Sequence, residues 1–319
     1  MTDLRSSDLR TSDLQTFLHG LWLPLVTPFR NGALDEASLR RMVRHYAGLS
    51  VNGLVLAATT GEGLTLEPGE IERLVFAVRD EVGVGNMPVC LGLSGSNTSA
   101  LLGTLARTAA WPIDGYLISC PYYSRPSQRG LELHFSALAD RAGHPVMLYN
   151  IPYRTGVNLG NEAMLRLADH PNIAGLKDCS ADRNQSLDLL RRRPAGFAVL
   201  TGEDAQYHEA LIDGADGGIL ASAHIETETF AQVWRLAVAG EHNAALARWR
   251  SVADLSRLLF SEPSPAPIKY WLWRTGLIES AEVRLPMTEV SAELAARLDL
   301  EIERRTAASV AGTGRHRVA

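Results

Sequence analysis

The stretch Gly53–Ser94, GLVLAATTGEGLTLEPGEIERLVFAVRDEVGVGNMPVCLGLS, contains a strand, a helix and a second strand in succession. Its two ends, GLVLAAT and PVCLGLS, are short and mostly apolar, as expected of buried strands. Between them apolar side chains recur at helical spacing in Ile71, Leu74, Val75, Val78 and Val82. This order predicts two parallel strands joined by a crossover helix.

Apolar runs of the same kind recur along most of the chain. They are LWLPLV, GYLISC, PVMLYN, IAGLKD, FAVLTG and GGILAS, beginning near positions 21, 115, 145, 173, 197 and 217. With the two runs above they make eight, about 20 to 35 residues apart, which is room for one strand, one helix and two loops. Eight buried parallel strands alternating with amphipathic helices predict an α/β protein, a closed (β/α)8 TIM barrel. A doubly wound open sheet is the alternative, but no Gly-x-Gly-x-x-Gly turn follows any run.

The segments outside these runs predict where the barrel begins and ends. Residues 1–19 are polar and are expected to form an N-terminal tail, and residues 20–225 hold the eight runs of the barrel. After about residue 226 the strands stop while helical patterns continue, which predicts a C-terminal helical extension over 226–307. Residues 308–319 offer little apolar surface to bury and are expected to fray.

Composition excludes several classes of protein. With 46% hydrophobic residues and a net charge of −5, the chain can bury a large core but has no electrostatic basis for binding nucleic acid. No apolar run approaches the ~20 residues of a membrane helix and no signal peptide is visible, so we expect a cytoplasmic protein that acts on small molecules. Cys90, Cys120 and Cys179 are too few and too widely spaced for a disulfide framework or a Cys-x-x-Cys metal site, so we expect packed, reduced thiols. No paired histidine spacing predicts a zinc site.

Lys177 is the strongest candidate for chemistry. Only two of the 31 basic side chains are lysines, Lys177 and Lys269, and Lys177 lies at the end of the run IAGLKD. The active site of a (β/α)8 barrel forms where the strands end, so Lys177 is expected at the barrel mouth among apolar side chains. Burial favours the neutral amine, which attacks a carbonyl group to form a Schiff base, whereas arginine stays protonated. A structural lysine paired with Asp178 or another carboxylate is the alternative. Lys269, after a proline-rich turn, suits a packing or ion-pair role better.

Polar residues also follow the neighbouring runs. Tyr149, at the end of PVMLYN, is a candidate proton carrier, and Thr60 and Tyr123 could link it into a hydrogen-bonded relay. The glycines of TTGEG, at 59–63, free backbone N–H groups to hold a carboxylate, and Arg154 could bind a second one through two hydrogen bonds. Taken alone, each tyrosine is more typical of a core residue with a satisfied hydroxyl group. Arg154, taken alone, is equally typical of a solvated or salt-bridged loop arginine.

Taken together, these motifs resemble the dihydrodipicolinate synthases of the pyruvate-dependent Schiff-base aldolase family. Five motifs occur in the family's order between about Leu21 and Thr288: TTGEG, PYYSRPSQ, YNIPYRTG, GLKD and RLPMT. The resemblance implies a lyase that condenses pyruvate with L-aspartate 4-semialdehyde to give 4-hydroxy-tetrahydrodipicolinate, in lysine and diaminopimelate biosynthesis. It also implies a homotetramer built from tight dimers, with no metal or organic cofactor.

The resemblance implies a role for each residue of the proton relay. Lys177 would condense with pyruvate, and Tyr149 would shuttle protons through Thr59 or Thr60 and Tyr123. Tyr123 would reach this relay from the adjacent subunit.

The resemblance also implies which residues hold the substrates. Thr60 and the N–H group of Gly61 would bind the carboxylate of pyruvate, and Arg154 that of the aldehyde. Gly202 and Ile219 match positions that line the Schiff-base pocket.

Relatives that use the same lysine and tyrosine include sialic acid lyases, 2-keto-3-deoxy sugar acid aldolases and hydroxy-oxoglutarate aldolases. Arg154 and the pair Thr59-Thr60 favour the synthase, because a polyhydroxylated substrate needs hydroxyl-binding groups more than a second carboxylate clamp. A barrel that only binds a ligand would be expected to have lost Lys177 or Tyr149, and both are present.

The sequence departs from the family pattern at four places that bear on the second substrate. Ala58 and Gly63 replace a glycine and a serine in the turn, Tyr153 precedes the arginine where a small residue is frequent, and His224 replaces an asparagine.

A second set of departures bears on regulation. In relatives inhibited by lysine, polar groups at the dimer interface bind the effector, whereas here Pro68, Ile71 and Leu101 stand at those places and Asn97 is retained. We expect lysine to inhibit weakly or not at all.

Overall fold

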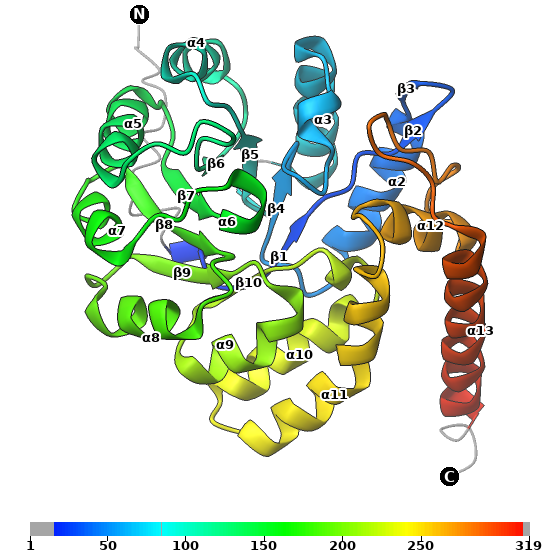
Figure 1. Cartoon of the computed structure of the whole chain (residues 1–319). Coiled ribbons are helices and arrows are strands. Elements are labelled where there is room, and N and C mark those ends of the chain that lie inside the picture. The colour runs from blue at the N-terminus through cyan, green and yellow to red at the C-terminus, as the bar shows by residue number, and fades with distance from the viewer. Residues whose placement is uncertain (1–15, 84, 315–319) are drawn as a thin grey trace, which may run out of the picture.

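Eight parallel strands form a closed barrel in the computed structural model of this chain, which describes residues 16–83 and 85–314 (Figure 1). Around the barrel the strands follow the order β1, β10, β9, β8, β7, β6, β5 and β4, and β4 pairs with β1 to close it. Their bounds are β1 (Gly20–Pro24), β4 (Gly53–Leu56), β5 (Val89–Leu93), β6 (Gly115–Ser119), β7 (Val146–Asn150), β8 (Ile173–Asp178), β9 (Ala198–Thr201) and β10 (Gly217–Ile219). Each apolar run of the sequence overlaps one strand, and the predicted (β/α)8 fold is confirmed.

In the described part of the chain a helix follows each barrel strand before the next one begins, and α10 follows the last. These helices are α2 (Glu36–Ala47), α3 (Pro68–Val82), α4 (Thr98–Thr108), α5 (Gln128–Arg141), α7 (Asn161–Ala168), α8 (Arg183–Arg192), α9 (Tyr207–Asp213) and α10 (Thr227–Val238). A single turn, α6 (Pro152–Thr155), lies directly after β7, and a two-stranded hairpin of β2 (Phe29–Arg30) and β3 (Ala33–Leu34) lies between β1 and α2.

The helical periodicity of the sequence corresponds to the buried faces. In α2 the residues Leu39, Met42, Val43 and Tyr46 are buried, and the Asp35 side chain accepts a hydrogen bond from the Ser38 N–H group at 3.1 Å to start the helix. In α3 the predicted stripe is buried from Leu74 to Val82, but Ile71 is only half-buried because it lines a cavity described below.

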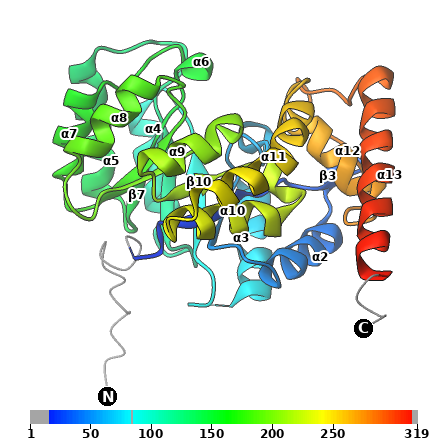
Figure 2. The same cartoon turned by 90° about the horizontal axis from the view of Figure 1, so that it is seen from below.

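The end of the barrel differs from the predicted boundary at residue 226. Helix α10 packs on β1 and α9, and the Trp234 indole donates a hydrogen bond to the Asp216 carbonyl oxygen at 3.0 Å, so α10 is the eighth barrel helix. The extension therefore consists of α11 (His242–Leu259), α12 (Ala266–Arg274) and α13 (Ala292–Gly314). Figures 1 and 2 show α13 beside α12 at the edge of the molecule.

The ends of the chain were assigned by composition alone. Helix α13 continues past residue 307 to Gly314, so most of the segment expected to fray is helical, in keeping with its alanines. Residues 1–15 of the predicted N-terminal tail lie outside the described part of the chain, and so do residues 315–319.

Side chains fill the barrel interior and leave only its mouth for chemistry. Trp22 is fully buried in an interior cluster with Val55, Leu117, Met147 and Leu200. The three cysteines are buried and free, as predicted. Among the described helices, none is long and apolar enough to cross a bilayer. Since the interior is packed, functional side chains gather at the carboxyl ends of the strands.

Candidate active site

Lys177 and Tyr149 are brought together by neighbouring strands. The register of β7 and β8 places Tyr149 opposite Lys177, and the Lys177 Nζ lies 4.6 Å from the centre of the Tyr149 ring. Both side chains are only 5% exposed. The pair therefore lies at the carboxyl ends of two strands, with the amine over the face of an aromatic ring.

The structure does not pair Lys177 with Asp178, which was the structural alternative. Asp178 instead accepts hydrogen bonds from the Ser180 N–H group at 2.9 Å and the Ser186 hydroxyl at 2.5 Å. Within the described residues Lys177 forms no salt bridge, whereas Lys269 forms one with Glu62 at 2.6 Å. No carboxylate in residues 16–83 and 85–314 therefore holds the Lys177 amine in an ion pair. The predicted ion-pair role of Lys269 is confirmed.

Tyr149 keeps its phenolic proton in this environment. Burial raises the pKa of Tyr149 well above its ordinary value, while a hydrogen bond with Thr59 and the charge of Arg154 act weakly in the opposite direction. A neutral phenol can donate one proton and accept another, which is what a proton carrier beside an amine requires.

The turn after β4 contains Thr59, Thr60 and Gly61. Ala57 and Glu62 both have a φ of 52°, and the Glu62 N–H group donates to the Thr59 carbonyl oxygen at 3.1 Å. The Thr27 hydroxyl donates to the Gly61 carbonyl oxygen at 2.7 Å, which fixes the turn against the loop after β1. Thr60 is buried and Thr59 is exposed. The turn is thus held by its backbone, with the Thr59 side chain free to bond with Tyr149.

Gly202 and Ile219 lie on the far side of Lys177 from Tyr149 in the strand order. Gly202 follows β9, and a Cβ atom added there would lie 2.3 Å from both the Lys177 Cε and the Cys179 Sγ. Ile219 ends β10 and is fully buried in the same interior cluster as Tyr149 and Cys179. Glycine at 202 is therefore what leaves room for the lysine side chain.

Arg154 lies at the rim, in α6. Its guanidinium carbon is 5.8 Å from the centre of the Tyr153 ring, and its side chain is exposed. The Tyr153 hydroxyl donates a hydrogen bond to the Glu203 carboxylate at 3.0 Å. An exposed cation beside the mouth is available for an anionic group of a substrate.

Glu203 and Cys179 were not among the predicted site residues. Burial raises the pKa of Glu203, while hydrogen bonds from Tyr153 and Cys179 oppose that rise. Burial also keeps the Cys179 thiol protonated by raising its pKa, so it can act as the donor. Glu203 lies just after the seventh barrel strand, β9. That place at a strand end could have identified it as a candidate from the sequence.

Tyr123 does not reach Lys177 within one chain. It follows β6, has a φ of 69° and is 92% exposed, while its N–H group donates to the Thr155 carbonyl oxygen at 3.1 Å. A large aromatic side chain in a left-handed conformation and open to solvent is unusual for a single chain.

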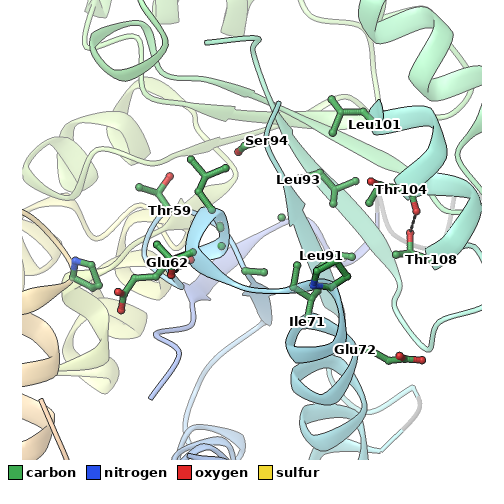
Figure 3. A pocket seen from close by; sticks show the side chains of 18 of the residues that line it. Thr59, Glu62, Ile71, Glu72, Leu91, Leu93, Ser94, Leu101, Thr104 and Thr108 are labelled. Atoms are coloured by element: carbon green, nitrogen blue, oxygen red, sulfur yellow. Dashed lines mark hydrogen bonds between the residues drawn. The ribbon is translucent and has the colours of Figure 1, made fainter. Parts of the chain in front are cut away.

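A cavity of about 710 Å³ opens between α3 and α4 beside the turn after β4. In Figure 3 Thr59 and Glu62 lie on one side of it, and Leu101, Thr104 and Thr108 on the other. Arg154 also lines it, but Lys177 and Tyr149 do not. The cavity therefore meets the candidate site only at its rim.

His224 is buried in the loop after β10, against the loop after β1. Its Nε2 accepts a hydrogen bond from the Val26 N–H group at 3.3 Å, and its Nδ1 bonds with the Ala221 carbonyl oxygen at 2.8 Å. Burial lowers the pKa of His224 to about 4. It is a neutral structural histidine that joins the β1 and β10 loops. Among the described residues no cluster of His, Cys, Asp or Glu could hold a metal ion.

Comparison with known proteins gives one family. The model of the "Dihydrodipicolinate synthetase family" matches residues 17–304. The chain is 41% identical over 282 residues to 4-hydroxy-tetrahydrodipicolinate synthase 2 of Clostridium acetobutylicum, covering 88% of this chain and 98% of that protein.

Solved structures agree with this result. A dihydrodipicolinate synthase from Acinetobacter baumannii, complexed with pyruvate, is 31% identical with a TM-score of 0.86, covering 90% of this chain and 98% of that one. A monomeric dihydrodipicolinate synthase variant is 30% identical with a TM-score of 0.88, covering 91% of this chain and 98% of the other. The chain belongs to the dihydrodipicolinate synthetase family.

Proposed function

We propose that this enzyme condenses pyruvate with L-aspartate 4-semialdehyde through a Schiff base on Lys177, giving 4-hydroxy-tetrahydrodipicolinate for lysine and diaminopimelate biosynthesis. The observation that carries the proposal is the buried Lys177 amine over the Tyr149 ring at the barrel mouth. It is supported by the family and by the relatives named above. We also propose that the enzyme works in the cytoplasm.

Schiff-base formation begins the reaction. The Lys177 nitrogen adds to the C2 carbonyl of pyruvate, and the resulting carbinolamine loses its hydroxyl group as water once Tyr149 supplies a proton. Thr60 and the N–H group of Gly61 bind the carboxylate of pyruvate, so that its C2 faces the amine. Gly202 leaves the space that the lysine side chain needs to reach this atom.

Carbon–carbon bond formation follows. Tyr149, deprotonated in the preceding step, takes a proton from C3 and so converts the imine to an enamine. The C3 atom of the enamine then attacks the aldehyde carbon of the second substrate. Tyr149 then delivers a proton to the new alkoxide, with Thr59 as its hydrogen-bond partner. Finally the amino group of the second substrate attacks C2, which closes the ring and releases Lys177. Arg154 holds the carboxylate of the aldehyde during these steps.

A second subunit completes the proton relay in this proposal. Tyr123 is 92% exposed, and Leu64, which lines the cavity, is 70% exposed. Large apolar side chains this open to solvent support contact with another copy of the chain. We place Tyr123 in the partner's relay within a homotetramer of tight dimers. Sedimentation velocity should find the tetramer, and a fully active monomer would contradict this role for Tyr123.

Another pyruvate-dependent aldolase is the second candidate. The hydrogen bond between Tyr153 and Glu203 at the mouth favours it, because these two groups could bind hydroxyl groups of a 2-keto-3-deoxy sugar acid. Hydroxy-oxoglutarate and sialic acid are further candidates of the same class.

A substrate panel separates the two candidates. Turnover is measured with pyruvate and aspartate semialdehyde, and in cleavage of 2-keto-3-deoxy sugar acids, hydroxy-oxoglutarate and sialic acid, with Lys177→Arg as control. We expect the largest kcat/KM with aspartate semialdehyde and none in the control. A larger kcat/KM with any of the other substrates would replace the proposed function.

A further inference from the structure

The second lysine of the chain forms a buried ion pair with Glu62, in the turn after β4. Lys269 lies in α12 and is 0% exposed, and its Nζ lies 2.6 Å from Glu62 Oε1. The other oxygen of Glu62, Oε2, accepts a hydrogen bond from the Arg284 N–H group at 2.8 Å. Both oxygens of this buried carboxylate are therefore satisfied by the C-terminal extension.

The surroundings of Lys269 fix its position closely. Its Nζ donates a second hydrogen bond to the Glu282 carbonyl oxygen at 2.6 Å and lies 4.2 Å from the centre of the Phe29 ring. The Arg284 guanidinium lies 4.2 Å from the same ring and binds Glu70 with two hydrogen bonds of 2.6 Å. Burial lowers the pKa of Lys269 to about 8, although Glu62 opposes this shift. A buried charge of this kind is tolerated only with such partners.

Glu62 transmits these contacts to the residues that bind substrate. It directly follows Thr59, Thr60 and Gly61, and its N–H group donates to the Thr59 carbonyl oxygen at 3.1 Å. Its φ of 52° is a conformation that a glutamate rarely adopts without support from its side chain. Figure 3 shows Glu62 beside Thr59 at the edge of the cavity.

We propose that Glu62 and Lys269 are positioning residues, which hold the turn from Thr59 to Gly61 in the geometry that binds the carboxylate of pyruvate. This inference rests on the proposed function, and it assigns to the C-terminal extension a part in the reaction. It also explains the second lysine. Its compact ammonium group places two donors between a carboxylate, a carbonyl group and a ring, where a planar guanidinium has a different shape.

The test compares Lys269→Met and Glu62→Gln with Arg79→Met. Arg79 is a matched control, since it is 6% exposed and pairs with Asp114 at 2.6 Å, but bonds with carbonyl groups of the loops before β5 and β6 at the opposite end of the barrel. Borohydride trapping with pyruvate alone gives the half-saturating pyruvate concentration, and thermal unfolding gives Tm. We expect K269M and E62Q to raise half-saturation about tenfold or more. R79M should lower Tm with no change in half-saturation.

Each outcome decides the inference. If K269M and E62Q change half-saturation no more than R79M does, the two residues are structural only and the inference is wrong. If these variants do not fold, Glu62→Asp keeps the charge and shortens the reach, and a folded E62D with wild-type half-saturation overturns the inference. A wild-type enzyme that traps no pyruvate contradicts the proposed function itself, and the inference with it.

Discussion

Replacing Gly202 with alanine is expected to disable Lys177 while the barrel stays folded. The added Cβ would lie 2.3 Å from the Lys177 Cε, whereas ordinary contact begins at 3.4 Å, so the lysine side chain must move by about 1 Å. A reacting group displaced by about 1 Å loses on the order of 100-fold in rate. The same Cβ meets Cys179 Sγ at 2.3 Å, and such overpacking costs about 1–3 kcal/mol of stability.

The assay separates these two effects. kcat/KM and the rate of borohydride trapping with pyruvate are measured for G202A, and urea unfolding gives its stability. Gly48→Ala is the control, because Gly48 ends α2, is exposed, has a φ of −84° and leaves a Cβ 3.5 Å from the nearest atom. G48A should match the wild type in every measurement. A folded G202A that keeps more than half of the wild-type kcat/KM would show that Lys177 does not need the space left by Gly202.

Arg154 at the rim of the barrel mouth, the cavity between α3 and α4, and His224 in the loop after β10 can each be tested as well. Arg154→Met should raise KM for the aldehyde about 10-fold or more, through loss of a charge-assisted hydrogen bond, and leave pyruvate trapping unchanged; initial rates that show an unaltered aldehyde KM would contradict this role. Free lysine added to the assay should leave activity nearly unchanged, because apolar Pro68, Ile71 and Leu101, which line the cavity, stand where lysine-inhibited relatives have polar groups. Strong inhibition by millimolar lysine would disprove this prediction. Burial lowers the pKa of His224 from 6.5 to about 4. Between these two values the imidazole is protonated in the unfolded chain but not in the folded chain, so the free energy of unfolding falls as the pH drops from 6.5 towards 4. Between pH 7 and pH 5 the wild type should therefore lose about 2 kcal/mol more than His224→Asn in urea unfolding, and equal losses would exclude His224 as the cause.

The sequence predicted the fold because the periodicity of its apolar residues is local. Eight apolar runs, separated by segments with helical periodicity, indicate parallel strands without any knowledge of which strands pair in the folded protein. The helix at Thr227–Val238 was assigned to the extension because an amphipathic pattern does not show what its face packs against, and only contact with β1 identifies it as a barrel helix.

The candidate site was predictable where it depends on strand ends. Lys177 and Tyr149 were identified because each ends an apolar run, and the register then places them together. The hydrogen bond between Tyr153 and Glu203 and the buried pair of Lys269 with Glu62 join segments 50 and 207 residues apart, which no local pattern reveals.

Peptide mapping shows directly whether Lys177 forms the covalent bond with pyruvate. The enzyme is incubated with pyruvate, reduced with borohydride, digested and analysed by mass spectrometry, with Lys269 as an internal comparison in the same sample. We expect one modified peptide, carrying the reduced pyruvate adduct on Lys177. A label on Lys269, or no label on a folded enzyme, would exclude Lys177 as the residue that forms the Schiff base.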